Sequence, residues 1–344
     1  MHSLISPPIM KSMLKIYHPE IYQGSKKRQS SKGYFEGWYF KTVSPQGIAL
    51  AIIVGVALNK ETSHAFIQTI DGTDGETTFS SFDISEFSTS QEPFSVSIGK
   101  NFFSKDTIII GDRTEIQGKL TFTNMIQLPI KFTRPGIMGW FRYVPRMECY
   151  HGVVSLRHTV KGSLSFKNKE IFFDQSQGYI EKDWGTSFPE SYVWMQSNSF
   201  STKNCSFMLS IAKIPWMRKY FRGFLGFLNI NQHIIVFSTY THASLEILHV
   251  TEKKITLCIQ GKGHGFNNSL AHGEMIKIEA HRESESSLAA PTAGHMDRRI
   301  GESIHAQISL QYSKEGKLIF ADTSTYSGLE MVGDMKQLQS SSHE

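Results

Sequence analysis

The hydrophobic and polar positions of the chain alternate with a period of two, which predicts β-strands. The uncharged run Ile48–Leu58 indicates a buried strand, and His64–Ile70 alternates up to Asp71-Gly72, a dipeptide typical of turns. No stretch combines a helical period with capping residues. Short polar clusters between the segments are typical of antiparallel sandwiches or barrels. Further strands are predicted at Phe94–Ile98, Thr107–Ile110, Ile116–Thr123, Ser163–Phe166, Cys205–Ile211, Ile234–Tyr240, Lys254–Gln260, Met275–His281, Ile304–Tyr312 and Lys317–Asp322.

A short motif occurs twice and indicates a duplicated architecture. Gly33-Tyr34-Phe35-Glu36 is similar to Gly178-Tyr179-Ile180-Glu181, and a tryptophan leads a strand after each copy, at Trp38 and Trp194. We therefore predict an all-β protein with few short helices, built from two antiparallel β-barrels or sandwiches in tandem. The predicted parts are an N-terminal extension at 1–30, a first β-barrel half at 31–170, a second half at 171–335 and a disordered tail at 336–344.

Composition narrows the class of protein. The 344 residues include 36 basic and 31 acidic side chains and 24 phenylalanines, so a disordered chain and a coiled coil are both excluded. A net charge of +5 is too small for its length to indicate nucleic-acid binding. Three widely separated cysteines predict neither a disulfide framework nor a metal knuckle. Because no signal-peptide core is visible either, we expect a cytoplasmic protein.

The densest group of reactive side chains lies between residues 178 and 198. Glu181, Lys182 and Asp183 stand between Tyr179 and Trp184. A carboxyl group beside large apolar rings can have a raised pKa and act as a general acid. An ion-paired turn that joins barrel strands explains the same residues, and on composition alone it is the more economical interpretation.

Two other positions carry weaker signals. Glu36 lies in the first copy of the motif beside Trp38, where a barrel strand with an inward-packed tryptophan is the simpler interpretation. His151 has no ligand residues at a recognised metal spacing, so we expect it to make a hydrogen bond inside a pocket. No nucleotide- or metal-binding motif is present, and neither a metal nor a cofactor is predicted.

Two segments, 134–146 and 214–228, combine aromatic with basic residues. Both are predicted to be long loops. Such loops suit a membrane surface, where rings lie at headgroup depth and cations meet anionic lipid. Ordinary packing between strands explains them equally well.

The motifs together resemble those of the tocopherol cyclase family. Gly33–Lys41 is similar to the family's opening signature, and Glu181–Gly185 with Trp194–Asn198 resembles its central signature. The resemblance runs from about residue 33 to 333. It implies a lipocalin-like double barrel that closes a chromanol ring on a prenylated quinol without a metal or redox cofactor. Further similar segments are Phe188-Pro189, Glu279–His281, Leu288–Thr292 and Gly328–Gly333.

The implied reaction requires an acid that protonates an alkene, after which the phenol oxygen attacks the cation. The plant cyclases carry Asn at the position of Asp183, so Glu181 is the better candidate for the acid. The resemblance thus indicates a cyclase, an intramolecular lyase of the isomerase class. The predicted catalytic residues are Glu181, Asp183, Lys182 and Glu36. The predicted substrate-binding residues are Trp38, Tyr39, Tyr179, Trp184, Trp194, Gln196 and His151.

Two alternative functions use the same apolar barrel. The related carotenoid hydratases protonate an alkene and let water attack, and a non-catalytic carrier would only bind an isoprenoid lipid. In each case the expected partner is a prenyl quinol or isoprenoid lipid, with peripheral membrane contact through 134–146 and 214–228. No nucleic-acid partner is expected.

Overall fold

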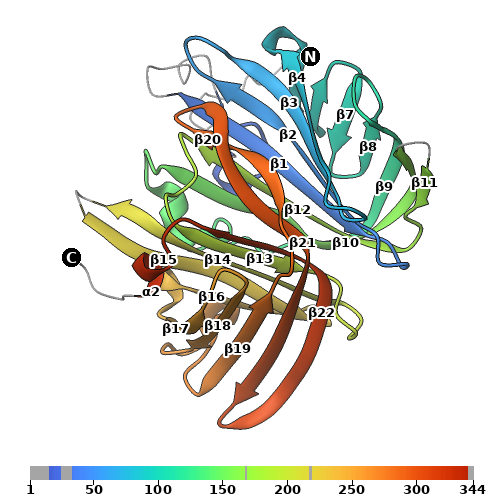
Figure 1. The fold of residues 1–344 in the computed structure, drawn as a ribbon. Helices are drawn as coiled ribbons and strands as arrows, with labels where there is room; N and C mark the ends of the chain where they lie inside the picture. The colour runs from blue at the N-terminus through green and yellow to red at the C-terminus, as the bar shows by residue number, and fades with distance from the viewer. Residues whose placement is uncertain (1–14, 25–32, 167–168, 217–218, 340–344) are drawn as a thin grey trace, which may run out of the picture.

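The computed structural model describes residues 15–24, 33–166, 169–216 and 219–339. Within this part of the chain, the strands form two large antiparallel sheets (Figure 1). The prediction of an all-β protein made of two tandem barrels or sandwiches with few short helices is therefore confirmed.

The first sheet rolls into a barrel. Its described strands are β1 (Tyr34–Val43), β2 (Ala49–Leu58), β3 (His64–Asp71), β4 (Thr77–Asp83), β5 (Phe87–Gln91), β6 (Phe94–Ile98), β7 (Asn101–Ser104), β8 (Thr107–Ile110), β9 (Ile116–Ile126), β10 (Cys149–Phe166), β11 (Lys169–Phe172) and β12 (Ser176–Gly185). Their order is β4-β3-β2-β1-β12-β10-β9-β8-β7-β6-β5, with β11 on β10. Because the 3₁₀ turn η2 (Ile84–Glu86) joins the edge strands β4 and β5 directly, the two edges must approach each other.

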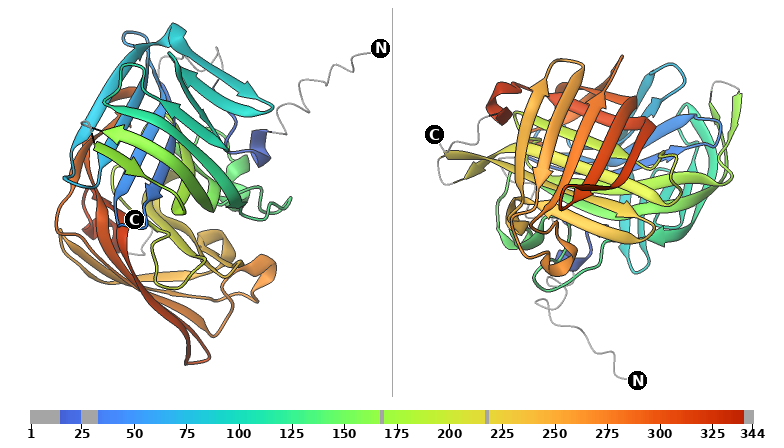
Figure 2. Two further views of the ribbon diagram at one scale, coloured as in Figure 1. Left: turned by 90° about the vertical axis from the view of Figure 1, so that its right-hand side faces the viewer. Right: turned by 90° about the horizontal axis from the view of Figure 1, so that it is seen from below.

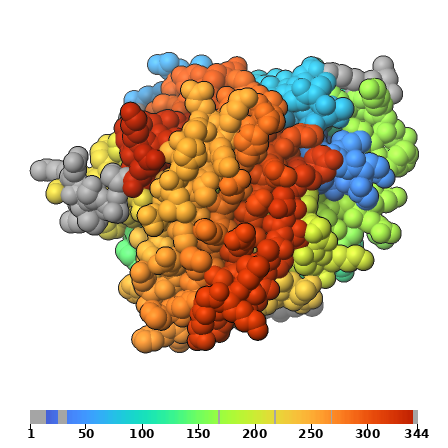
Figure 3. All heavy atoms as spheres, turned by 60° about the horizontal axis from the view of Figure 1, so that its bottom comes forward, coloured from blue at the N-terminus to red at the C-terminus, as the bar shows by residue number. Residues whose placement is uncertain are grey.

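The second sheet follows the same path. Its described strands are β13 (Tyr192–Ser197), β14 (Cys205–Trp216), β15 (Lys219–Ile230), β16 (His233–Ser238), β17 (Ser244–Val250), β18 (Lys254–Gln260), β19 (Glu274–His281), β20 (Ser286–Thr292), β21 (His295–Lys314) and β22 (Lys317–Val332). Their order is β16-β15-β14-β13-β22-β21-β19-β18-β17, with β20 on β21. The turn η4 (Thr239–Thr241) links the edges, and the strands from β17 onward lie side by side across one face (Figure 3).

The two sheets share one order of strands, which supports a structural repeat. This repeat does not follow the spacing of the duplicated Gly-Tyr motif. In each sheet four strands run outward, the chain moves to the far edge, and the last strand returns to pair with the first: β12 with β1, and β22 with β13. Both motif copies lie in the first sheet, since Gly178–Glu181 belongs to β12. Trp38 and Trp194 lie in the corresponding strands β1 and β13. The change of sheet falls between Gly185 and Tyr192, and the domain boundary near residue 170 stays a prediction.

An arm of the second sheet holds the two barrels together. The hairpin of β20 and the first half of β21 reaches over β3 and β4 of the first sheet (Figures 1 and 2). Gln68 exchanges two hydrogen bonds with the backbone of Ala289, and the Ser286 hydroxyl donates to the Gly75 carbonyl at 2.7 Å. The space between the barrels is thereby closed on one side by the chain itself.

The chain ends partly contradict the expected disorder. Residues 336–339, predicted to be a disordered tail, form the short helix α2 (Lys336–Gln339). Leu338 is fully buried in the second barrel's core, and Arg222 donates to its carbonyl at 2.8 Å, which explains the order. Residues 340–344 of the predicted tail, and 1–14 and 25–30 of the predicted extension, lie outside the described residues.

The two aromatic and basic segments meet in the structure. The second is not a loop, since 214–216 end β14 and 219–228 lie in β15, which pair as a hairpin. The first contains the 3₁₀ turn η3 (Gly139–Tyr143). The ring of Phe141 lies 6.0 Å from that of Phe221 and 6.1 Å from that of Trp216, so the segments share one aromatic cluster. Among the described helices, none has the length and apolar character needed to cross a membrane.

Candidate functional site

The alternation of strand β12 separates the predicted site residues into two groups. Side chains of successive strand residues point to opposite faces. Tyr179, Glu181 and Asp183 face the second sheet, whereas Lys182 and Trp184 point into the first barrel. Neighbours in sequence therefore serve different environments.

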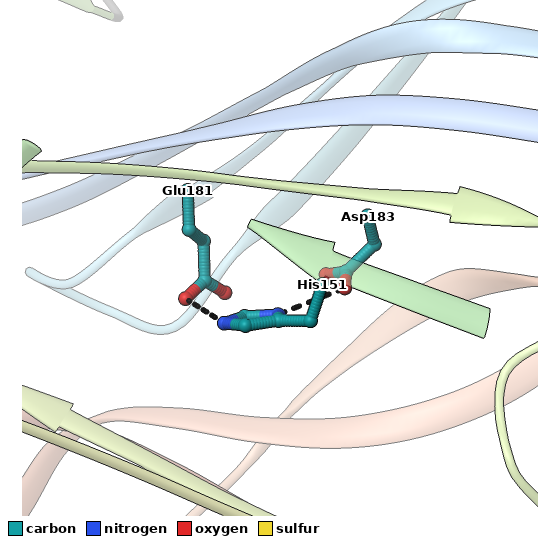
Figure 4. A group of neighbouring side chains, drawn as sticks. All are labelled: His151, Glu181 and Asp183. Carbon is teal, nitrogen blue, oxygen red and sulfur yellow. Dashed lines mark hydrogen bonds and ion pairs between the residues drawn. The ribbon is translucent and has the colours of Figure 1, made fainter. Parts of the chain in front are cut away.

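A histidine lies between two carboxylates on the inter-barrel face (Figure 4). His151 on β10 stands opposite Asp183 in the strand register, and its Nδ1 lies 2.9 Å from Asp183 Oδ1. Its Nε2 lies 3.5 Å from Glu181 Oε2. Glu181 Oε2 also accepts hydrogen bonds from the Tyr179 hydroxyl at 2.6 Å and from Trp194 Nε1 at 3.2 Å. We call Asp183, His151 and Glu181 the acid chain.

Burial and charge shift the pKa values of Glu181 and His151 toward a range useful for proton transfer. Burial is the main cause that raises the pKa of Glu181 to about 7, and the cationic form of His151 opposes this rise. Burial alone would lower the pKa of His151, but the carboxylates of Asp183 and Glu181 outweigh it and raise that pKa to about 9. Near neutral pH a charged imidazole thus lies beside a carboxyl group that both holds and releases a proton.

The acid chain forms one wall of an apolar cavity of about 120 Å³. A second apolar space adjoins it and shares Met138, Ile214 and Leu225 with it. That space leads to the rings of Phe141 and Phe221. The rest of the first cavity's wall is mostly apolar and aromatic and includes Met147, Phe188, Pro189, Tyr192, Trp194, Ala212 and Pro215.

The donor set of the acid chain also invites comparison with a metal centre. One nitrogen and two carboxylate oxygens lie within 4.8 Å of one another. However, Asp183 faces Nδ1 of the His151 ring, whereas Glu181 faces Nε2 (Figure 4). A single ion can bind only one of these two ring nitrogens. The arrangement therefore fits a row of ion-paired groups better than a chelate. The sequence did not reveal the group, because His151 precedes the two carboxylates by about thirty positions.

The predicted residues on the other face form a closed structural cage. Lys182 Nζ lies 2.5 Å from Glu36 Oε1, and both side chains are fully buried. The ammonium is 4.8 Å from the ring centres of both Trp38 and Trp184, and it donates to the Ile21 carbonyl at 2.6 Å. None of these four side chains lines the inter-barrel cavities. For these four residues, the simpler interpretation of an ion pair with an inward-packed tryptophan describes the structure.

Two glutamates that sequence reasoning missed also face the inter-barrel space. Tyr39, a predicted binding residue, donates from its hydroxyl to Glu302 Oε1 at 2.6 Å. Glu330 lies in β22 and accepts a hydrogen bond from Tyr192. Gln196, also predicted to bind substrate, instead lies 3.3 Å from Lys41 Nζ through its Oε1. Glu330 belongs to the closing segment Gly328–Gly333, which could have identified it.

Two rolled antiparallel sheets with buried acids at the apolar space between them define the class, a tandem β-barrel protein with an acidic inter-barrel site. The sequence profile described as tocopherol cyclase-like matches residues 113–333. The chain belongs to this family. A protein of Oryza sativa subsp. japonica described as a probable chloroplastic tocopherol cyclase is 24% identical over 213 residues. The match covers 57% of this chain and 42% of the rice protein, so this chain corresponds to less than half of that relative.

A solved structure shares the fold. The crystal structure of kievitone hydratase from Nectria haematococca superposes with a TM-score of 0.51, covering 91% of this chain and 93% of that protein. Sequence identity over the superposition is 10%, so the likeness concerns the fold alone.

Proposed function

We propose that the protein closes a ring on a prenylated phenol by acid catalysis, with Glu181 as the proton donor. The observation that carries this proposal is the acid chain, with Glu181 buried, on the wall of an apolar cavity. Membership of the tocopherol cyclase-like family supports the choice of a prenyl quinol as substrate.

The reaction needs no net exchange of atoms with solvent. The carboxyl proton of Glu181 adds to the less substituted carbon of the alkene, so the C=C π bond breaks and a C–H bond forms. The phenol oxygen attacks the resulting tertiary cation, a C–O bond forms, and the phenolic proton passes to the Glu181 carboxylate. The product is an isomer of the substrate, and Glu181 regains its proton.

The rest of the site suits a cationic intermediate. The Trp194 ring lines the cavity and donates a hydrogen bond from its Nε1 to Glu181, so an aromatic side chain lies beside the proton donor. The nearby carboxylate of Asp183 stabilises positive charge in a poorly solvated space. Protonated His151 supplies a reserve proton next to Glu181.

The test is to incubate the protein with 2-geranylhydroquinone under inert gas and to analyse the products by mass spectrometry. We expect a product of unchanged mass that has lost one hydroxyl group to ring closure. A product heavier by one water would identify a hydratase instead. Binding without any product would identify a carrier and contradict the proposed function.

We also propose that the aromatic cluster of residues 134–146 and 214–228 faces an anionic lipid surface. Trp140, Tyr143 and Tyr220 are exposed there, together with the cations of Arg146 and Lys219. The neighbouring Phe132 is 79% exposed. Because the second apolar space connects this cluster to the cavity, a lipid substrate would pass from the bilayer without crossing water.

Vesicle flotation tests this contact. The protein is expected to float with vesicles that contain phosphatidylglycerol and to bind pure phosphatidylcholine more weakly. Phe132→Ser should reduce flotation. The matched control is Phe172→Ser, which is 59% exposed in β11 at the far end of β10 and should leave it unchanged. Equal flotation of both variants would contradict the assigned surface.

A further inference from the structure

The inter-barrel space has a second polar end that the acid chain does not explain. A small cavity of about 70 Å³ lies between β1 to β3 of the first sheet and the β20–β21 arm. It adjoins the main cavity, because Glu181, Asp183, Phe188 and Glu330 line both. Glu302 of β21 is the acid found only in the smaller cavity.

Glu302 has one occupied and one unoccupied oxygen. Its side chain is fully buried, and Oε1 accepts the hydrogen bond from Tyr39. Oε2 is also buried, but it makes no hydrogen bond with any described residue. A buried polar atom without a partner destabilises a fold, so such an atom in a cavity indicates a missing group.

The surroundings define the group that would fit. Gln68, another polar side chain in this wall, has both amide atoms engaged with the Ala289 backbone. Most of the remaining wall is apolar, including Phe35, Phe66, Leu288 and Ile300. Burial and the nearby charge of Glu330 raise the pKa of Glu302 to about 8, so its carboxyl group can donate as well as accept. A hydroxyl group can hydrogen-bond with the protonated or the ionised carboxyl group, because it both donates and accepts.

We infer that Glu302 binds a hydroxyl group at the end of the substrate's aromatic ring distal to the prenyl chain. This inference rests on the proposed function, in which Glu181 protonates the alkene. We add that the prenyl tail extends along the second apolar space toward Phe141 and Phe221. The head of the substrate then enters the smaller cavity between Tyr39 and the β20–β21 arm. Glu302 is accordingly the residue that distinguishes a prenyl quinol from a prenylated monophenol in this proposal.

The test compares two probes that differ by one hydroxyl group. Binding of 2-geranylhydroquinone and of 2-geranylphenol is titrated calorimetrically in the Glu181→Gln background, where no turnover interferes. We expect the hydroquinone to bind about ten-fold or more tightly, as one hydrogen bond to an ionisable group supplies. In the added Glu302→Leu variant this preference should disappear, and Glu302→Gln should restore part of it.

Two further variants separate direct binding from damage to the fold. Glu302→Leu leaves the Tyr39 hydroxyl without its partner, so Tyr39→Phe with Glu302→Leu removes both groups and should show the same loss of preference. Glu274→Gln is the matched control, since this side chain of β19 lines neither cavity and its amide oxygen can still accept from the Ala271 backbone N–H, and it should keep the preference.

The outcomes are distinct from those of the proposed function. If Glu302→Leu weakens both probes by the same factor, or if the parent shows no preference, the hydroxyl subsite is wrong even where ring closure is observed. If the preference follows Glu302 but the native protein forms no product, the subsite stands and the protein is a binder of hydroquinones.

Discussion

The two faces of strand β12 carry the same kinds of charged residue and use them differently. On the inner face, the Lys182 ammonium lies between two tryptophan rings and against Glu36, and the carboxylate also accepts from the backbone N–H of Gln23 and Gly24. On the outer face, Glu181 and His151 border a cavity, and His151 Nε2 makes no hydrogen bond within the described part of the chain. The inner group is complete without a ligand, whereas the outer group has capacity left for one.

We expect this difference between a stabilising ion pair and the reactive group that we propose. A buried ion pair with all its partners tolerates substitution poorly, because removing one member leaves the other as a buried charge without a counter-charge. A reactive acid must instead be partly desolvated but still accessible, so that a substrate can come within hydrogen-bond distance of it. Composition and clustering are the same on both faces, and only the contacts distinguish them.

The largest effect is expected on turnover when the outer acid is removed. Glu181→Gln keeps the shape of the side chain but has no acidic proton, so turnover of 2-geranylhydroquinone should fall by about 10²- to 10⁴-fold. Product formation is measured by mass spectrometry. The matched control is Glu148→Gln, which lines the same cavity outside the acid chain and should change turnover by far less. Unchanged turnover in Glu181→Gln would remove it from the role of acid.

The next largest effect is expected on stability when the inner cation is removed. Lys182→Met leaves the fully buried Glu36 without its counter-charge, which should lower the free energy of unfolding by about 3–5 kcal/mol. Lys254→Met breaks the exposed pair with Glu279 and should change it by at most about 1 kcal/mol. Chemical unfolding measures both. If Lys182→Met instead reduced turnover as strongly as Glu181→Gln in fully folded protein, the division between the two faces would be wrong.

The third expectation concerns the pH dependence of stability. The pKa of Glu181 is raised from 4.5 to about 7, so the folded protein holds this proton more tightly than the unfolded chain. Its contribution to stability is therefore complete below pH 4.5 and is lost as the pH rises through about 7. Glu181→Gln has no such loss, so its unfolding midpoint relative to the native protein should increase from pH 4.5 to 8. A constant difference would show that Glu181 titrates normally.

The sequence predicted the strands far better than the site. Period-two segments such as Phe94–Ile98 and Met275–His281 lie within strands β6 and β19, because one face of each is more deeply buried and the pattern records that burial. The segment 214–228 was misread as a loop, since its many aromatic residues obscured the pattern of the β14–β15 hairpin.

At the candidate site, the sequence motifs identified the residues but did not show on which face of the sheet each side chain lies. Glu181 and Lys182 are adjacent in sequence, and only the pleat of β12 shows that they point in opposite directions. His151, Glu302 and Glu330 reach the site from β10, β21 and β22, through pairings far apart in the chain that a local pattern does not contain. Long-range sheet register is therefore the information that the sequence reading lacked.

The smallest effect is expected at the other end of the acid chain. Asp183→Asn keeps an oxygen that can accept from His151 Nδ1 at the present 2.9 Å, but it removes the negative charge that most strongly raises the pKa of this histidine. The pKa should fall from about 9 toward the ordinary value of 6.5, as an NMR titration of the ring would show. Turnover should change by less than in Glu181→Gln, because the proton donor remains. If the histidine kept its pKa in Asp183→Asn, Asp183 would not be the residue that holds His151 in its charged form.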